Sequence, residues 1–210
     1  MTTAGISCRA INKQCDKHEM KVMGLIGNYS ATGNATGSYL MADSSVLYTG
    51  RPFFIHDFAD SFLAAPSIVV RTGRLGKCIA AKFAHRYWDA FTAGFSVMAC
   101  QSDDQRLTAL DHAFDGAAIV GDWVTVTSID DPLHAVVEVK VDDAVVSRCC
   151  LADMTWPLDE VMAAASTRCS IKMGDLLFTG DCAKGLPLAP GMHLTASIGG
   201  TSVLDVKVRR

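Results

Sequence analysis

The sequence predicts one domain of the α+β class that is rich in β-structure. Many short apolar segments, each bounded by Gly, Pro, Asn or Asp, are typical of strands joined by turns. Helical periodicity is confined to two segments, which argues against a doubly wound parallel sheet. The 210 residues show no internal repeat, linker or low-complexity tract. We therefore expect a single domain over residues 20–210, preceded by a polar N-terminal extension over residues 1–19.

The predicted strands are short and occur along most of the chain, with a hairpin turn at Asp142-Asp143. Asn28–Gly37, rich in Gly, Asn, Ser and Thr, is expected to form a loop, and Cys100–His112 a loop or short helix. The strands are expected at Lys21–Ile26, in two parts of Val46–Phe58, and at Ser67–Arg71, Phe95–Ala99, Ala117–Thr127, His134–Lys140, Ala144–Cys150, Leu176–Thr179, Leu194–Ile198 and Val203–Val208.

Two helices are expected. Large apolar residues recur at every fourth position over Ile79–Phe91, which predicts a helix that Gly94 ends. A second helix is expected to begin at Pro157, because proline suits the first helical position. The acidic residues Asp159 and Glu160 would then lie near the positive end of its dipole.

The composition excludes several classes of protein. Half of the residues are apolar, a fifth are charged and the formal net charge is −3, as in soluble globular proteins. No basic stripe indicates nucleic acid, and no apolar run approaches the roughly 18 residues that span a bilayer. The polar start lacks the apolar centre of a secretory signal, so we expect no membrane partner and a cytoplasmic location. Reduced thiols are expected for the cysteines, which form no paired C-x-x-C pattern: Cys8, Cys15, Cys78, Cys100, Cys149, Cys150, Cys169 and Cys182.

Short motifs occur in a defined order from residue 27 to the C-terminal region. They are Gly27–Tyr29, Arg74–Lys77 with Ala84–Tyr87, Phe114–Gly116, Ala152–Met154, and Gly174–Gly180 followed by Leu186–Gly191. A single Gly-Asp before a strand is an ordinary turn. Five motifs in register resemble the fumarylacetoacetate hydrolase family, especially its short bacterial members. The resemblance implies a mixed β-sandwich or roll-like barrel, usually a homodimer.

The resemblance also implies a chemistry and the ligands that it needs. Active members of the family use Mg²⁺ or Mn²⁺ to hydrolyse, decarboxylate or tautomerise small β-diketo or oxo acids. An E-x-E pair on one strand and an Asp on the next supply hard oxygen ligands. These positions fall on Ala65, Ser67 and Ser96, and between Phe62 and Asp89 the sequence has no Asp or Glu in any register. We therefore expect no metal cofactor, the alternative being Mg²⁺ or Mn²⁺ at a rebuilt site.

Other positions of the family motif are replaced as well. The arginine that follows the metal ligands falls near Cys100, and the lysine before the F-D-G motif falls on His112. The threonine and proline of the G-T-P loop fall on Asp181 and Cys182. The N-terminal loop, Thr32–Thr36, lacks the His and Glu that hydrolytic members use to activate water.

Several side chains offer an alternative to a lost site, each beside a plainer interpretation. His112 suits general-base chemistry and is a possible partner for a Cys100 or Cys182 thiolate, although loop histidines and buried thiols are common. His56 and His85 are interpreted as a strand-end and a helix-face residue. The acidic candidates for a rebuilt metal site, which are otherwise solvated or cap helices, are Asp57, Asp60, Asp103, Asp104 and Asp181.

Three functional hypotheses follow. The first is a catalytically degenerate family member whose vestigial cavity binds a small organic acid or nothing, and which serves as a binding, regulatory or assembly module. The second is a hydrolase or decarboxylase of β-diketo or oxo acids with a site rebuilt from Asp181, His112 or Cys100. The third is an interaction subunit of a larger complex, with an exposed apolar patch in the isolated chain.

Overall fold

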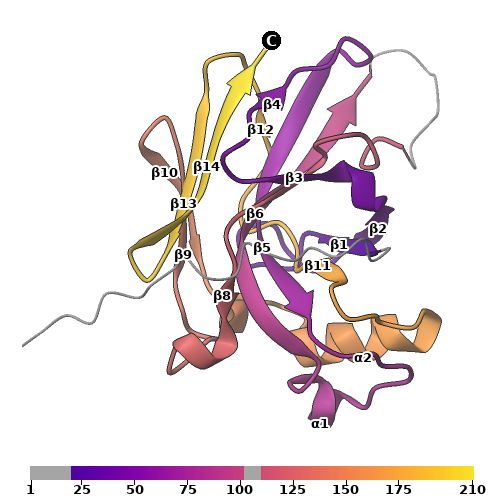
Figure 1. Cartoon of the computed structure of the whole chain (residues 1–210). Helices are drawn as coiled ribbons and strands as arrows, with labels where there is room; N and C mark the ends of the chain where they lie inside the picture. The colour runs from indigo at the N-terminus through magenta and orange to yellow at the C-terminus, as the bar shows by residue number, and fades with distance from the viewer. Residues whose placement is uncertain (1–19, 102–109) are drawn as a thin grey trace, which may run out of the picture.

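The computed structural model describes residues 20–101 and 110–210, which build two β-sheets that pack against each other (Figure 1). The nine-stranded sheet has the order β2-β1-β11-β5-β6-β7-β3, with β12 beside β5 and β8 beside β6, and the five-stranded sheet has the order β10-β9-β13-β14-β4. The strands are β1 (Val22–Ile26), β2 (Gly37–Met41), β3 (Val46–Tyr48), β4 (Phe53–Phe54), β5 (Ser61–Thr72), β6 (Trp88–Cys100), β7 (Ala118–Val120), β8 (Val124–Thr125), β9 (Val137–Val141), β10 (Ala144–Cys149), β11 (Leu176–Phe178), β12 (Leu186–Pro187), β13 (His193–Ile198) and β14 (Thr201–Arg209). The expected extension over residues 1–19 lies outside the described residues.

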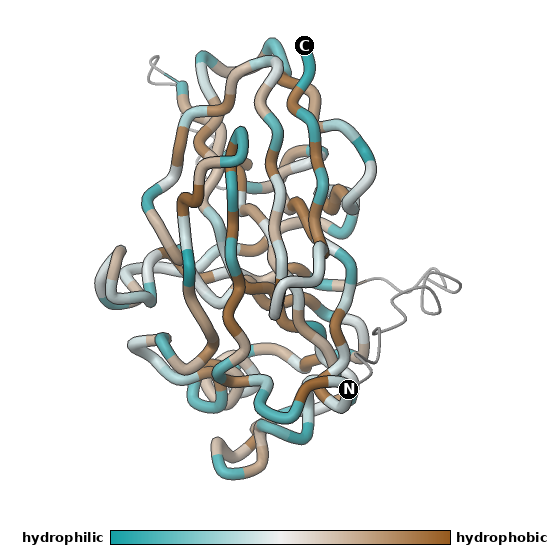
Figure 2. Tube along the Cα trace, turned by 90° about the vertical axis from the view of Figure 1, so that its left-hand side faces the viewer, coloured by the Kyte–Doolittle hydropathy of each residue, from teal (hydrophilic) through white to brown (hydrophobic). Residues whose placement is uncertain are grey.

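The described chain confirms the β-rich α+β class. Its α-helices are α1 (Ala81–Ala84) and α2 (Leu158–Arg168), which lie together at one end of the sheets (Figure 1). Neither helix is long and apolar enough to cross a bilayer. Along the smaller sheet, hydrophobic and hydrophilic residues alternate (Figure 2), because one face of each strand packs inward and the other meets solvent.

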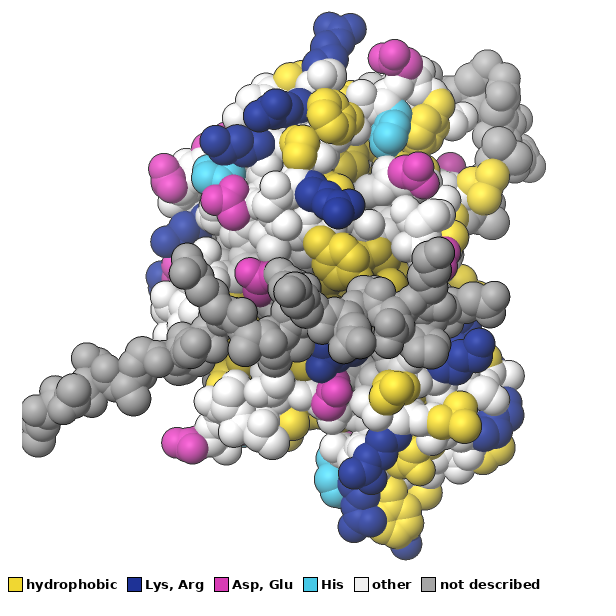
Figure 3. Space-filling model, in the orientation of Figure 1, with side chains coloured by type: hydrophobic (Ala, Val, Ile, Leu, Met, Phe, Trp, Pro, Cys, Tyr) yellow, Lys and Arg dark blue, Asp and Glu magenta, His cyan; other side chains and the backbone are white. Residues whose placement is uncertain are grey.

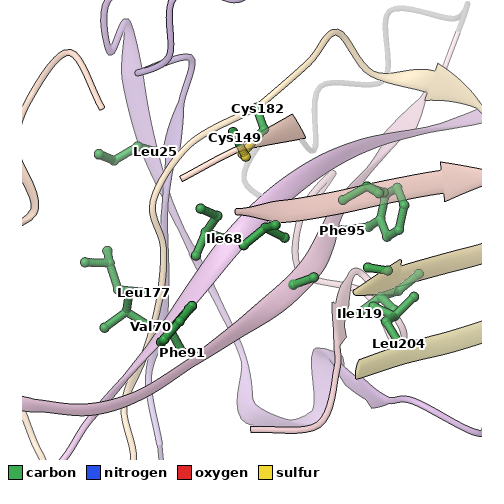
Figure 4. Packing of buried hydrophobic residues seen from close by; sticks show 14 of the residues in the cluster. Leu25, Ile68, Val70, Phe91, Phe95, Ile119, Cys149, Leu177, Cys182 and Leu204 are labelled. Atoms are coloured by element: carbon green, nitrogen blue, oxygen red, sulfur yellow. The ribbon is translucent and has the colours of Figure 1, made fainter. Parts of the chain in front are cut away.

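The centre of the fold is the antiparallel pair β5–β6, of 12 and 13 residues, which stays paired from Ser61 to Thr72. Alternate residues of the pair, among them Ile68 and Phe95, pack between the two sheets (Figure 4). Residues of the opposite parity, such as Val69, join a smaller cluster on the other face. Because both faces are covered, β5 and β6 read as almost continuous apolar runs.

The helix predicted over Ile79–Phe91 is wrong. Only Ala81–Ala84 is α-helical, and β6 begins at Trp88. A spacing of four residues fits one face of a helix, but it is also a multiple of the two-residue period of a strand, so it did not distinguish the two. Gly94 lies inside β6, where an added Cβ would come within 2.4 Å of the Ile119 carbonyl oxygen. That glycine permits close packing of a strand and does not end a helix.

The remaining expectations differ in detail. Pro157 is the N-cap of α2 and not its first helical residue, and the helix begins at Leu158. The hairpin at Asp142-Asp143 is confirmed, with φ angles of 48° and 68° between β9 and β10. Most of the expected loop Cys100–His112 lies outside the described residues.

A buried asparagine joins the end of β1 to the end of β11 and the start of α2. The Asn28 amide nitrogen donates to the carbonyl oxygens of Thr179 at 2.9 Å and Trp156 at 3.3 Å. Its amide oxygen accepts from the Trp156 backbone nitrogen at 2.7 Å and from the Thr155 hydroxyl at 3.0 Å. Asn28 is fully buried with a φ of 83°, a conformation that asparagine tolerates better than most residues. These bonds hold together three segments that border the site described below.

Replacing this side chain is expected to destabilise the fold severely. Asn28→Ala leaves several buried polar groups unpaired and places a Cβ-bearing residue without a local hydrogen bond at positive φ. We expect the free energy of unfolding to fall by about 3 kcal/mol, measured by urea denaturation. Asn34→Ala, at an exposed position of the same loop, is the matched control and should change stability by less than about 0.5 kcal/mol. Equal effects of the two substitutions would contradict this account.

Candidate functional site

The three positions that the family resemblance assigns to metal ligands are neighbours on two paired strands. Ala65 of β5 faces Ser96 of β6 in the antiparallel register, and Ser67 lies two residues from Ala65 on the same face of the sheet. Ser67 and Ser96 are 1% and 3% exposed, so both are shielded from bulk water. The place where three carboxylates would meet therefore carries two hydroxyl groups and a methyl group.

A tyrosine from a neighbouring hairpin fills the space beside Ser96. Tyr39 of β2 pairs with Gly24 of β1, and a Cβ on Gly24 would lie 2.1 Å from the Tyr39 ring carbon Cζ. Gly24 thus makes room for the ring. Tyr39 Oη is buried, and no atom of the described chain meets the geometry of a hydrogen bond with it. The Ser96 hydroxyl is nevertheless near enough to lower the Tyr39 pKa. Burial outweighs that effect and raises the Tyr39 pKa far above its ordinary value, so the phenol is neutral.

Tyr39 was missed by the sequence reasoning. The available signal was Gly24, because an isolated glycine inside an apolar strand marks a site where another group approaches closely.

His112 covers the other side of the tyrosine. The two rings are stacked with their centroids 4.4 Å apart and an interplanar angle of 4°. Burial lowers the His112 pKa, and the charge of Asp111 only partly offsets this effect. The imidazole is therefore neutral near pH 7, and its Nδ1 is buried without a hydrogen-bond partner. The position that the resemblance assigns to a lysine thus holds a side chain without a permanent charge.

Asp181 is held by the loop that follows β1. Its carboxylate accepts a hydrogen bond from the Gly27 backbone nitrogen at 2.9 Å, and its carbonyl oxygen accepts one from the Thr32 hydroxyl at 2.6 Å. Burial raises the Asp181 pKa, while the Gly27 amide opposes that rise. The carboxylate lies near enough to Tyr39 for its charge to raise the Tyr39 pKa further. Asp181 therefore borders the site, with one oxygen already engaged in holding a loop.

The two cysteine candidates lie on different faces of the larger sheet. Cys182 points into the core between the sheets, toward Cys149 (Figure 4). Burial raises its pKa well above the usual range, and the neighbouring thiol of Cys149 adds to the rise, which disfavours a thiolate. Cys100 lies on the Ser96 face but at the end of β6, about 13 Å further along the strand. The structure therefore does not bring the two cysteines together at His112.

The other candidates are dispersed. His56 packs in an aromatic cluster with Phe58, Phe62 and Phe114, and its Nε2 lies 3.0 Å from the Asp115 carbonyl oxygen. His85 is exposed after α1. Asp57 and Asp60 precede β5, whereas Asp103 and Asp104 fall outside the described residues.

The donor set does not fit a hard divalent cation. Mg²⁺ and Mn²⁺ sites are built mainly from carboxylate and carbonyl oxygens. Within residues 20–101 and 110–210, no three His, Cys, Asp or Glu side chains gather as such a site requires. The positions on β5 and β6 supply neutral groups instead, and an unionised phenol lies beside them.

A cavity of about 1040 Å³ adjoins Tyr39 and His112. It extends around β1 and β2 to α2, so its wall comes from both faces of that part of the sheet. Apolar side chains dominate the wall, with polar groups from Thr36, Trp156 and Arg168. A volume of this size is ample for a small organic molecule.

Solved structures of several enzymes share this fold. A 5-carboxymethyl-2-hydroxymuconate delta-isomerase from Mycobacterium smegmatis aligns with a TM-score of 0.78 and 21% identity, over 91% of this chain and 79% of that one. A maleylpyruvate hydrolase from Sphingobium sp. SYK-6 aligns with a TM-score of 0.80 and 18% identity, over 91% and 71% of the two chains. A fumarylpyruvate hydrolase from Pseudomonas aeruginosa, in complex with Mn²⁺ and pyruvate, aligns with a TM-score of 0.78 and 20% identity, over 91% of this chain and 89% of that one. At these identities the likeness shows a common fold and not a common activity.

Sequence comparison places the chain more specifically. Among curated proteins, none matches it. A family profile described as fumarylacetoacetate (FAA) hydrolase C-terminal matches residues 6–209, which is nearly the whole chain and includes part of the predicted N-terminal extension. The motifs in register, the two-sheet fold and this match agree, and the chain belongs to the fumarylacetoacetate hydrolase family.

Proposed function

We propose that this chain is a degenerate member of its family, which does not use a divalent metal to hydrolyse C–C bonds and instead binds a small organic acid beside Tyr39 and His112. The observation that carries the proposal is the replacement of the ligand set. Neutral side chains stand at Ala65, Ser67 and Ser96, and the Tyr39 ring lies beside Ser96. A homodimer in the cytoplasm stays a prediction from the family resemblance.

The charge of the site supports the loss of metal chemistry. A divalent cation gives up its water only for ligands that return comparable electrostatic energy, and hydroxyl groups of Ser67 and Ser96 return far less than carboxylates. Ser67 and Ser96 are also almost completely buried, which leaves little room for the retained waters that Mg²⁺ usually keeps. The site therefore lacks both the charge and the hydration that the ion needs.

The cavity supports a binding role. Its wall combines apolar surface with a few polar groups, the usual composition of a small-molecule site. Arg168 supplies a cation that suits a carboxylate, and the neutral His112 and Tyr39 offer hydrogen-bonding atoms that lack partners within the described chain. An oxo acid fits this combination of groups.

A second candidate is a metal-free enzyme for proton transfer on an oxo acid. Two buried polar atoms without partners, Tyr39 Oη and His112 Nδ1, favour it, because unpaired polar groups cluster where a ligand completes the hydrogen bonding. In this alternative neutral His112 removes a proton and Tyr39 donates a hydrogen bond to the enolate oxygen. This alternative would be established over pure binding by two results. The protein would catalyse proton transfer on oxaloacetate in the presence of a chelator, and His112→Gln would lose that activity.

The first test measures metal binding and turnover together. Mn²⁺ added to the protein should keep the electron paramagnetic resonance signal of the free aqueous ion, and neither Mg²⁺ nor Mn²⁺ should raise the melting temperature. If the ion binds the folded protein, a free ion concentration 100 times the dissociation constant would raise the free energy of unfolding by roughly 2.7 kcal/mol. The Pseudomonas aeruginosa fumarylpyruvate hydrolase, which binds Mn²⁺, is the positive control. Stoichiometric uptake of Mn²⁺ with metal-dependent turnover of acylpyruvates would overturn the proposal.

The second test distinguishes a space-filling tyrosine from one that acts through its hydroxyl. Tyr39→Phe keeps the ring over Gly24 and removes a buried oxygen that has no partner, so stability should stay equal or rise by up to about 1 kcal/mol. Tyr39→Ala empties the space and should cost about 3–5 kcal/mol. Chemical denaturation gives both values. A loss above 1 kcal/mol in Tyr39→Phe would show that the hydroxyl makes a hydrogen bond on which the fold relies.

The third test uses the pH dependence of stability. The folded-state pKa of His112 is lowered, so below about pH 6.5 the unfolded chain binds a proton that the folded chain does not. Stability should therefore fall as the pH drops through that value. His112→Phe retains a planar ring over Tyr39 and removes the titration, so its stability should depend less on pH between about 5 and 7, as followed by urea midpoints. An unchanged pH profile would mean that other groups govern the loss.

A further inference from the structure

Two loops far apart in the sequence join into a projecting lobe at the α1 end of the molecule (Figure 1). The backbone of Gly76 exchanges hydrogen bonds with that of Ile171, at 2.9 and 2.8 Å, and the Cys78 nitrogen donates to the Ser166 carbonyl oxygen at 3.0 Å. The two segments therefore form one surface. We call this surface the basic lobe. It comprises exposed Lys and Arg residues and the apolar residues between them, and its cations are Arg74, Lys77, Lys82, Arg86 and Lys172.

The basic lobe carries more positive than negative charge, with Asp159 of α2 near His85 as a carboxylate close to α1. The sequence has no Asp or Glu between Phe62 and Asp89, and none between Glu160 and Asp175. The nearest acidic residues at the C-terminal ends of these stretches are already paired: Asp89 with Arg71 at 2.9 Å and buried Asp175 with Lys21 at 2.5 Å. In the described part of the chain, no lysine or arginine of the lobe forms an ion pair with a carboxylate. A protein with a net charge of −3 thus presents a separate cationic end.

Large apolar side chains project between these cations. Leu75 is 73% exposed, Met173 63% and Phe83 42%. The Phe83 ring contacts two of the charges, with its centroid 4.9 Å from the Lys82 Nζ and 5.0 Å from the Arg86 Cζ. Figure 3 shows the dark blue and yellow side chains intermixed on the lower lobe. Exposure of three large apolar residues in this setting costs solvation energy and calls for a partner.

We propose that the basic lobe is a docking surface for an anionic lipid membrane. Lysine and arginine attract acidic headgroups, while Leu and Phe between them enter the boundary between headgroups and acyl chains. Nucleic acid would use the same charges but gains little from an exposed Leu75 and Met173, since phosphates and sugars offer them no apolar contact. A projecting lobe also suits a deformable bilayer surface, because it requires no complementary groove in the partner.

The test is cosedimentation of the full chain with sucrose-loaded vesicles. The protein should pellet with vesicles of phosphatidylcholine and phosphatidylserine, and much less with phosphatidylcholine alone. Raising the ionic strength should release part of it, because salt screens the attraction of the lobe for the headgroups. Equal pelleting with both kinds of vesicle, or none with either, overturns the proposal.

Two pairs of substitutions separate the charge from the apolar contact. Lys82→Glu with Arg86→Glu should weaken binding to the acidic vesicles by about thirtyfold or more. Leu75→Ser with Phe83→Ser keeps every charge and should weaken binding mainly at high salt, where the apolar contribution remains. The lipid proposal is overturned by a combination of two results. The charge-reversed variant would lose binding to a DNA duplex, and the serine variant would bind vesicles as well as the unmodified chain. The lobe would then be a nucleic-acid surface.

The matched control is Lys207→Glu with Arg210→Glu. It makes the same change in net charge at exposed positions near the C-terminus, at the opposite end of the molecule from α1 (Figure 1). This variant should bind the acidic vesicles within about twofold of the unmodified chain, since its charges lie well beyond the Debye length from the lobe. An equal loss in the control and in Lys82→Glu with Arg86→Glu would mean that net charge, and not the lobe, governs the binding. Thermal unfolding of each variant verifies that it is folded.

Discussion

The antiparallel pairing of β5 and β6 determines most of the structure. Because side chains alternate along each strand, this one register sends Ile68 and Phe95 into the core between the sheets and Ser67 and Ser96 to the opposite face. A slip of one residue would exchange the two sets. The apolar core therefore fixes the positions of Ala65, Ser67 and Ser96 regardless of which side chains occupy them, and the fold can outlast the chemistry that relatives perform on it.

The groups beside Ser96 are held by packing. Carboxylates that surround a cation form an electrically balanced site. A neutral phenol beside hydroxyl groups is also balanced, and it needs no ion. Gly24 admits the Tyr39 ring, and the His112 ring stacks on one face of that ring. Burial favours the neutral forms of Tyr39 and His112, beside a cavity whose wall is mostly apolar.

The sequence predicted the fold class, most strands and the Asp142-Asp143 hairpin, because these depend on local pattern and turn chemistry. It failed over Ile79–Phe91, where a four-residue spacing fits both helix and strand. The family resemblance led to the prediction of Ala65, Ser67 and Ser96, which the structure places as neighbours, whereas it gave no indication of Tyr39, whose placement depends on a glycine that faces it across a hairpin. The basic lobe was missed for a similar reason. Composition shows an average charge, whereas the lobe arises only when two separate segments meet through Gly76 and Ile171.

The close fit between Gly24 and Tyr39 also limits how this lineage can change. An acidic residue introduced alone at Ser96 would be buried without a counterion, and one introduced at Ser67 would meet the same penalty. Building an ion-binding centre at this place would therefore require several substitutions, including replacement of the Tyr39 ring.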